Sequence, residues 1–256
     1  MREKKIMLAI ISIITICLVV ATAVVCGVYI KPIRTKGLEY SENSDGTYTV
    51  TGMGTCQETE IVIDTSRTKK VTEIGNWAFA FRESISSVSM GDSVTSIGNN
   101  AFYNCVGLKD VTMGENLTYI GYNAFYGCSS LENITIPSSV EYLCEGAFYG
   151  CYSLKSIEIP SGIKNIRSRT FYWCSSLTSI VIPDSVTSID NSAFQYCNSL
   201  DRVYFGGSKA DWENMTILPL NEYLLDADVY FYSESQMYSQ SGARYWHYVN
   251  GVPTKW

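Results

Sequence analysis

Few residues in this 256-residue chain have a type and spacing that would support catalysis. His247 is the only histidine, which argues against most zinc sites and most histidine-based triads. Two pairs of carboxylates, Glu132 with Glu158 and Asp184 with Asp190, have the composition of a general acid and a general base. General acid catalysis needs a partly buried carboxyl group with a shifted pKa, and no insertion near these residues would form a pocket. We therefore expect solvated carboxylates, no enzyme activity, and no catalytic, cofactor-binding or metal-binding residue.

Five of the nine cysteines recur at intervals of 23 residues, which stacks them if the chain coils regularly. They are Cys105, Cys128, Cys151, Cys174 and Cys197. Because the sequence has no Cys-x-x-Cys pair, we expect buried apolar thiols rather than a row of metal or redox thiols. Stacked cysteines that point the same way lie further apart at Cβ than a disulfide prefers.

An internal repeat of 23 residues determines the elements that position these side chains. Six units follow one another without a gap, starting at Val71, Val94, Leu117, Val140, Ile163 and Val186. The ninth position is phenylalanine in every unit, and positions 18 and 20 alternate as in a short strand with one inward face. A glycine or proline then turns the chain back.

A single unit cannot bury its apolar side, whereas six stacked units form one hydrophobic column. We therefore predict an α/β repeat solenoid in which every unit adds one strand to a parallel sheet on one face. The segment around each phenylalanine is too short for a stable helix, so we expect short helical turns or coils on the other face. The predicted parts are a hydrophobic segment with its flanks (1–37), an N-terminal β cap (38–70), the repeats (71–208), and a C-terminal cap with an aromatic tail (209–256).

The repeat resembles a known family. The stretch AFYGCSSLENITIPSSV at 124–140 and its copies are similar to the BspA-type leucine-rich repeat of bacterial and protist surface proteins. The flanks EYSENSDGTYTVTGMG (39–54) and FGGSKADWENMTI (205–217) resemble the caps of those proteins, whereas Arg82 and Thr170 depart from the repeat pattern. The resemblance implies a right-handed leucine-rich repeat coil with a surface or secreted binding role, often described as adhesion.

An uncharged stretch of 25 residues, 6–30, follows the basic start of the chain. A helix of this length, rising about 1.5 Å per residue, spans the roughly 30 Å hydrocarbon core of a bilayer. It predicts a single hydrophobic helix that anchors the protein in a membrane, with the repeats outside the cytoplasm. The alternative is a cleaved signal peptide, with Ala21-Thr22-Ala23 before the cut, which would give a secreted protein.

The charge balance argues against a nucleic-acid partner. The chain has 19 Lys and Arg residues against 25 Asp and Glu residues, a net charge of −6. After residue 30 the balance is 16 to 24, which suits an exported domain exposed to water.

Two surfaces are candidates for partner binding. The first is the concave face of the predicted sheet, where solenoids usually bind, and it carries Lys109, Asp110, Glu132, Asn133, Lys155, Glu158, Arg202 and Tyr204. Because these residues are mixed in charge, they predict neither an acidic nor a basic ligand, and an ordinary solvated face is the alternative.

The second surface is a row of tyrosines, Tyr103, Tyr126, Tyr149 and Tyr172, directly after the core phenylalanines. Aromatic stripes bind sugars or proteins, but each tyrosine could instead pack on the neighbouring coil and expose only its hydroxyl. The sequence therefore predicts a non-catalytic surface or secreted protein that mediates protein–protein interaction or adhesion. The alternative is a carbohydrate-binding module that uses surface aromatic residues.

Overall fold

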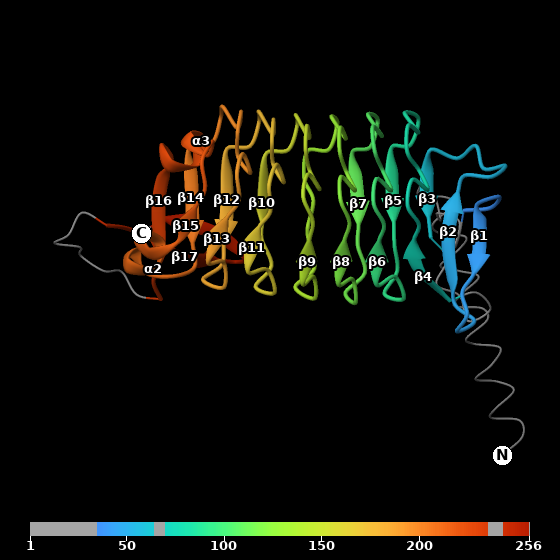
Figure 1. The fold of residues 1–256 in the computed structure, drawn as a ribbon, viewed down its shortest axis with the longest axis horizontal. Coiled ribbons are helices and arrows are strands. Elements are labelled where there is room, and N and C mark those ends of the chain that lie inside the picture. The colour runs from blue at the N-terminus through green and yellow to red at the C-terminus, as the bar shows by residue number, and fades with distance from the viewer. Residues whose placement is uncertain (1–34, 64–69, 235–242, 256) are drawn as a thin grey trace, which may run out of the picture. The chain divides into compact units, whose positions relative to one another are not determined.

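The computed structural model describes residues 35–63, 70–234 and 243–255 (Figure 1). They belong to one compact unit, residues 34–256, built from short strands and turns with two short helices, α2 (Lys209–Asn214) and α3 (Glu222–Leu225). The predicted membrane segment, residues 6–30, lies outside the described residues. Among the residues that are described, no helix has the length and apolar character needed to cross a membrane.

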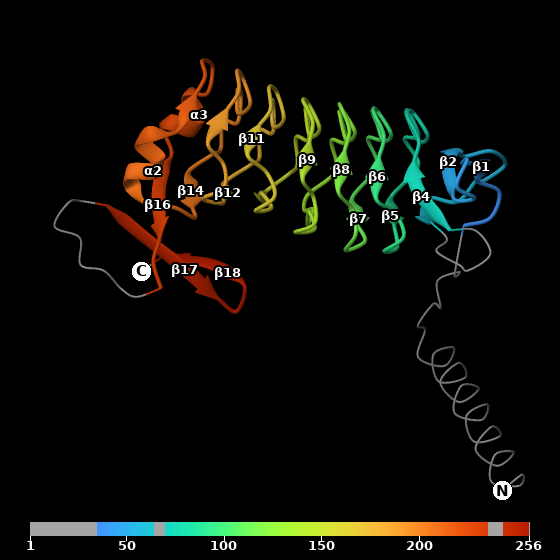
Figure 2. The ribbon, with the colours of Figure 1, turned by 60° about the horizontal axis from the view of Figure 1, so that its bottom comes forward.

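Every repeat contributes a strand to one face of the stack, and every repeat except the third contributes a strand to a second face (Figures 1 and 2). The upstream face, formed by the strand before each core phenylalanine, comprises β4 (Val71–Ile74), β6 (Ser96–Ile97), β8 (Tyr119–Ile120), β9 (Tyr142–Leu143), β11 (Asn165–Ile166), β13 (Ser188–Ile189) and β15 (Thr216–Ile217). The downstream face comprises β3 (Glu60–Val62), β5 (Ser87–Ser89), β7 (Asp110–Thr112), β10 (Ser156–Glu158), β12 (Ser179–Ile182), β14 (Arg202–Phe205) and β16 (Asp228–Tyr232). The pairs within both faces are parallel.

The prediction of a parallel-stranded solenoid is confirmed, but the face of helical turns is wrong. The segments that carry the phenylalanines are turns, and two positions in each of them have a positive φ, for example Asn100 at 57° and Asn104 at 54°. A residue in the left-handed region interrupts a right-handed helix, so these segments cannot coil as predicted. The second face forms because even a two-residue strand pairs in register with the strand of the next repeat.

The core is a column of phenylalanines, as predicted. Phe79, Phe102, Phe125, Phe148, Phe171 and Phe194 are fully buried. Neighbouring rings stack almost in parallel along most of the column, and the centroids of Phe102 and Phe125 lie 5.2 Å apart. The backbone N–H of each of the first five ring residues donates to a carbonyl of the next repeat, as from Phe125 to Ala147 at 2.8 Å. Side-chain stacking and backbone hydrogen bonds therefore hold the same repeats together.

Both faces are interrupted near the middle of the stack. On the upstream face β9 does not pair with β11. On the downstream face the third repeat places no strand between β7 and β10, and an isolated bridge joins its Asn133 to Ser156 of β10. The core stays continuous across the upstream break, because the rings of Phe148 and Phe171 remain stacked with centroids 5.8 Å apart.

Different elements close the two ends. At the N-terminal end, β1 (Glu39–Glu42) and β2 (Tyr48–Gly52) form an antiparallel hairpin, and β2 pairs with β4. At the other end, the buried Asn221 side chain takes the place of a further repeat. Its Oδ1 accepts the Phe194 N–H at 2.9 Å, and its Nδ2 donates to the carbonyls of Asp190 and Leu218. The column thus ends without an unpaired amide at its last phenylalanine.

The C-terminal tail forms a hairpin that turns back along the stack. Strand β17 (Arg244–Val249) pairs in parallel with β16, and β18 (Val252–Lys255) returns antiparallel to β17. Figure 2 shows this hairpin projecting from the last strands toward the middle of the repeats. The aromatic tail lies on β17, where Trp246 packs on the outside of the downstream face.

Candidate binding groove

The C-terminal hairpin is anchored by a second hydrophobic cluster on the outside of the downstream face. Trp246 is only 1% exposed and packs with Val181, Tyr204 and Tyr230. Its indole Nε1 donates to the carbonyl of Phe205 at 2.9 Å. The hairpin is therefore held by buried aromatic contacts as well as by its backbone pairing with β16.

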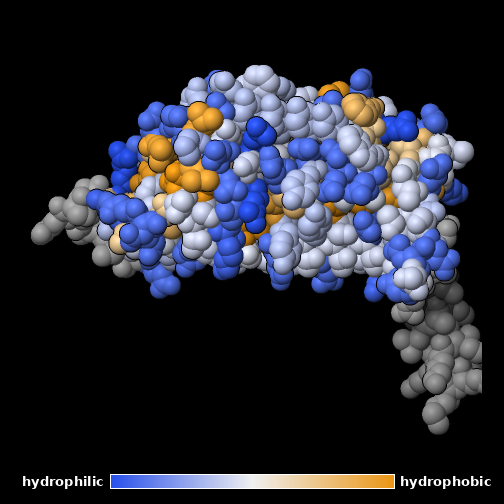
Figure 3. Space-filling view, in the orientation of Figure 1, coloured by the Kyte–Doolittle hydropathy of each residue, from blue (hydrophilic) through white to orange (hydrophobic). Residues whose placement is uncertain are grey.

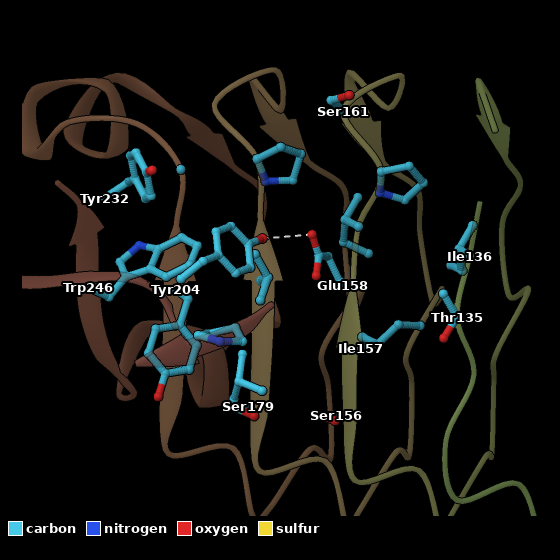
Figure 4. Close-up of a pocket in the computed structure, with 18 of the residues that line it drawn as sticks. Thr135, Ile136, Ser156, Ile157, Glu158, Ser161, Ser179, Tyr204, Tyr232 and Trp246 are labelled. Carbon is cyan, nitrogen blue, oxygen red and sulfur yellow. Dashed lines mark hydrogen bonds between the residues drawn. The ribbon is translucent and has the colours of Figure 1, made fainter. Parts of the chain in front are cut away.

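A groove of about 1010 Å³ lies between this hairpin and the downstream face (Figure 4). Its floor comes from β10, β12 and β14, including Ser156, Glu158, Ser179 and Arg202, and its wall comes from Tyr232, Trp246, Tyr248, Val252 and Pro253. In Figure 4, Tyr232 and Trp246 stand at one side, Thr135 and Ile136 at the other, and Glu158 lies between them.

One hydrogen bond joins the far end of the hairpin to the floor. The Tyr248 hydroxyl donates to Oε1 of Glu158 at 2.7 Å, across 90 residues of sequence. Burial and the neighbouring carboxylate raise the pKa of Tyr248, so its hydroxyl stays protonated and able to donate at neutral pH. This contact fixes the width of the groove at β10.

The predicted concave-face residues do not form one surface. Glu158, Arg202 and Tyr204 line the groove, and Asn133 lies at its end. Tyr204 is only 6% exposed because Trp246 packs against its ring. The exposed residues Lys109 and Asp110 belong to an earlier repeat and lie outside the groove lining.

Lys155 and Glu132 form an exposed ion pair between neighbouring repeats. The hydrogen bond from Lys155 lowers the pKa of Glu132, and the charge of Lys155 adds to this effect. Such exposed pairs contribute little to stability, so we assign this pair to the solvated part of the face.

The groove offers binding chemistry. Its charged side chains are Glu158, Asp184 and Arg202, and five serine and threonine hydroxyls also line it. Within the described ranges, no group of three or more His, Cys, Asp or Glu side chains is placed to hold a metal ion. An aromatic wall facing a floor of donors and acceptors suits the side chains and backbone of an extended ligand.

Sequence reasoning missed the hairpin, although a signal for it was present. Asn250 and Gly251 connect the two strands as a two-residue loop, with φ of 51° and 77°. Asn-Gly between β-prone runs is a strong hairpin signature, because both residues tolerate the positive φ of a type I′ turn. The position of the hairpin over β10 depends on contacts distant in sequence.

The tyrosine row is a closed stack. The rings of Tyr103, Tyr126, Tyr149 and Tyr172 are half-buried and lie face to face, with centroid separations of 4.4 to 4.6 Å. Burial and the adjacent hydroxyls raise the pKa of Tyr126 to about 12. Because each inner ring already covers its neighbours' faces, the row cannot offer those faces to a sugar.

The cysteine ladder is buried, as predicted. Each of the five thiols donates to the carbonyl of a phenylalanine in the preceding repeat, as from Cys128 to Phe102 at 3.2 Å. Burial raises the pKa of Cys105 to about 12 and that of Cys128 well above its usual range. These thiols therefore stay protonated and act as small core residues with a donor.

The fold defines a class: a solenoid of leucine-rich repeats. The chain belongs to the family of the BspA type leucine rich repeat region, whose model matches six copies over residues 72–201, slightly more than half of the chain. No curated protein matches the chain.

Three of the solved structures that are similar to this chain illustrate the likeness. A leucine rich cell surface protein from Faecalibacterium prausnitzii A2-165 is 31% identical, with a TM-score of 0.50 over 71% of this chain and 41% of that protein. The leucine rich repeat protein TpLRR of T. pallidum is 24% identical, with a TM-score of 0.51 over 64% of this chain and 88% of that protein. The pneumococcal vaccine antigen PcpA is 18% identical, with a TM-score of 0.55 over 74% of this chain and 47% of that protein.

The chain thus spans less than half the length of the Faecalibacterium protein. The likeness to TpLRR and to PcpA shows the fold alone.

Proposed function

We propose that this protein is a non-catalytic surface receptor whose groove binds an extended segment of a partner protein. In this proposal residues 6–30 hold the chain in the membrane, and the repeats at 71–208 stand outside the cytoplasm between the caps at 38–70 and 209–256. The observation that carries the binding role is the folded-back hairpin, which converts an open sheet face into a groove of about 1010 Å³.

The dimensions and chemistry of the groove favour a peptide segment. Its floor presents one short strand from each of three successive repeats, about 4.8 Å apart, so an extended ligand meets Ser156, Ser179 and Arg202 at regular intervals. Tyr232 and Tyr248 are partly exposed, and the buried Trp246 holds them in place. Tyrosines fixed in this way supply contact area with little loss of side-chain entropy on binding.

Membership of the family and the likeness to a bacterial cell surface protein support a location at the cell surface. The closed faces of the tyrosine row argue against carbohydrate binding there, so we place the function in the groove. The lining of the groove is mixed in charge, which predicts a partner that is recognised by shape and hydrogen bonding more than by net charge.

The test uses the full chain displayed on bacterial cells. A photoreactive amino acid at Ser179, on the groove floor, should form a discrete adduct with one partner protein. The same amino acid at Thr187, an exposed position at the upstream face, is the control. Equal adducts at both positions, or no adduct at Ser179, would refute the groove as the binding site.

A second pair of variants tests occupancy. Ser179→Arg fills the groove floor and should weaken partner binding at least about tenfold, whereas Thr187→Arg adds the same side chain on the other face and should leave binding unchanged.

A further inference from the structure

Two positions in every repeat adopt a left-handed backbone conformation. They are positions 7 and 11 of the 23-residue unit, on the turns that join the upstream face to the downstream face. In the second, third and fourth repeats these positions hold asparagine or glycine, namely Asn100, Asn104, Asn123, Gly127, Gly146 and Gly150. Glycine and asparagine are the residues that tolerate a positive φ, so the middle of the stack follows the ordinary rule.

The ends of the stack break this rule with large aromatic residues. Trp77 and Phe81 in the first repeat have φ of 61° and 60°, and Trp173 and Tyr196 in the fifth and sixth have φ of 62° and 64°. A bulky residue with positive φ is a genuine outlier, and strained backbone concentrates at functional sites.

These strained side chains are exposed. Trp77 is 52% exposed, Phe81 61%, Trp173 42% and Tyr196 37%. They contact the two ends of the tyrosine row, since Phe81 lies 5.4 Å from Tyr103 and Trp173 lies 5.7 Å from Tyr172 between ring centroids. Contact with the row alone does not explain them, because much of each ring still faces water.

The turns that carry these residues form a nearly uncharged edge, which we call the turn edge. It consists of positions 6 to 14 of the six repeats: 76–84, 99–107, 122–130, 145–153, 168–176 and 191–199. Its only charged residues are Arg82, Glu83, Glu145 and Arg169, two of each sign, and the last two pair with each other at 3.3 Å. The edge therefore lacks the net negative charge of the chain.

The arrangement along the turn edge is self-complementary. Large exposed aromatic groups stand at both ends, whereas the middle carries three glycines (Gly127, Gly146 and Gly150) together with the exposed rings of Tyr122 and Tyr152. A two-fold axis near the third repeat would place the aromatic pair of one copy against the aromatic pair at the opposite end of the other copy, twice.

We propose that the turn edge binds a second copy of this chain in an antiparallel, isologous contact. In such an interface the same surface is used by both copies, and the two end contacts are identical. Six repeats about 4.8 Å apart give an edge about 29 Å long. The patch that each partner buries in a standard interface, about 800 Å², is of similar length. The balanced charges of the edge remove the repulsion that two acidic copies would otherwise meet.

Cysteine crosslinking of the full chain tests both the contact and its direction. Ser130→Cys, in the third repeat near the proposed axis, should crosslink to its own copy with a short bismaleimide. Ser84→Cys occupies the same position of the first repeat and should not crosslink to itself. A mixture of the Ser84→Cys and Ser176→Cys chains should crosslink, because these repeats face each other. The parent chain gives the background from its own cysteines.

The strained aromatic residues allow a second test of the contact. Replacing Trp77 and Phe81 together by asparagine, the residue that the second repeat uses at these positions, should reduce the Ser130→Cys crosslink at least tenfold. The same change should leave the thermal midpoint of the uncrosslinked chain unchanged or raise it, because it removes backbone strain. Changing Trp173 to glycine and Tyr196 to asparagine should have the same two effects from the other end.

Four results would overturn the proposal. No crosslink above the parent background would exclude the contact, and equal crosslinking of Ser84→Cys with itself would show a parallel arrangement. A large fall in thermal midpoint with the crosslink retained would show that Trp77 and Phe81 only cap the tyrosine row. If cellohexaose stabilises the parent chain, but not the Trp77 and Phe81 variant, while crosslinks are absent, the edge is a glycan site instead.

Discussion

Replacing Phe125 by alanine tests the stacked core most sharply. The ring is fully buried between Phe102 and Phe148, with centroids 5.2 and 5.4 Å away and planes within 5°. Removing a buried phenylalanine costs about 3 to 5 kcal/mol, depending on how far the site can collapse. Here hydrogen bonds to the repeats on both sides hold the backbone, so we expect about 4 to 5 kcal/mol.

The position of the ring in the column supplies an internal comparison. Phe79 is equally buried but has a stacked phenylalanine on one side only, at 5.2 Å. We therefore expect Phe79→Ala to cost about 1 kcal/mol less, since each aromatic pair contributes about 0.5 to 1.5 kcal/mol beyond burial. Urea unfolding followed by circular dichroism measures both values. Tyr126→Phe, which keeps its ring, is the control and should change stability by less than about 1 kcal/mol.

A loss below about 1 kcal/mol for Phe125→Ala would refute an inward-facing column. A larger loss for Phe79→Ala than for Phe125→Ala would refute the stacking argument while leaving burial intact.

Three further predictions follow from single contacts. Asn221→Ala leaves the buried Phe194 amide unpaired and should lower the free energy of unfolding by about 1 to 3 kcal/mol in the same urea experiment; a change below about 0.3 kcal/mol would contradict its capping role. The thiols of Cys105 and Cys197 have their pKa raised from 9.0 to about 12 by burial, so their contribution to stability is present below pH 9 and is lost as pH rises from 9 to 12; thermal midpoints across this range should fall, and a flat profile would contradict buried thiols. Tyr248→Phe removes the bond to Glu158 and should speed amide hydrogen exchange in β18 with little change in global stability, whereas unchanged exchange would show that the aromatic cluster alone holds the hairpin.

The repetitive part of the fold was predictable because its signals recur with a fixed period. Phenylalanine at the ninth position of each repeat fixes the inner side of that repeat, and cysteine three residues later then falls inside as well. Both predictions are confirmed, because all six phenylalanines and all five cysteines of the ladder are buried.

The second face of strands was not predictable from periodicity. Ser96–Ile97 and Tyr119–Ile120 are too short to show an alternation of apolar and polar residues. They become strands because the neighbouring repeat supplies the hydrogen-bond partner, and a partner 23 residues away leaves no trace in a local pattern.

The groove was even less predictable from the sequence than the second face of strands. Glu158 was correctly placed on the strand face, but nothing near it in sequence indicates that Tyr248 lies against it. The bond between them depends on Trp246 packing on Tyr204, a contact between two segments that the repeat does not relate. Likewise, spacing placed Tyr126 and Tyr149 in one row, whereas only the geometry of the stack shows that their faces are closed.

Carboxyl footprinting of the chain bound to the partner captured at Ser179 tests the central claim most directly. If the groove is the binding site, Glu158 and Asp184 should lose carbodiimide labelling on binding, while Asp110, on an earlier repeat of the same face, should label as before. Protection of Asp110 with unchanged labelling of Glu158 and Asp184 would contradict the assignment of the groove.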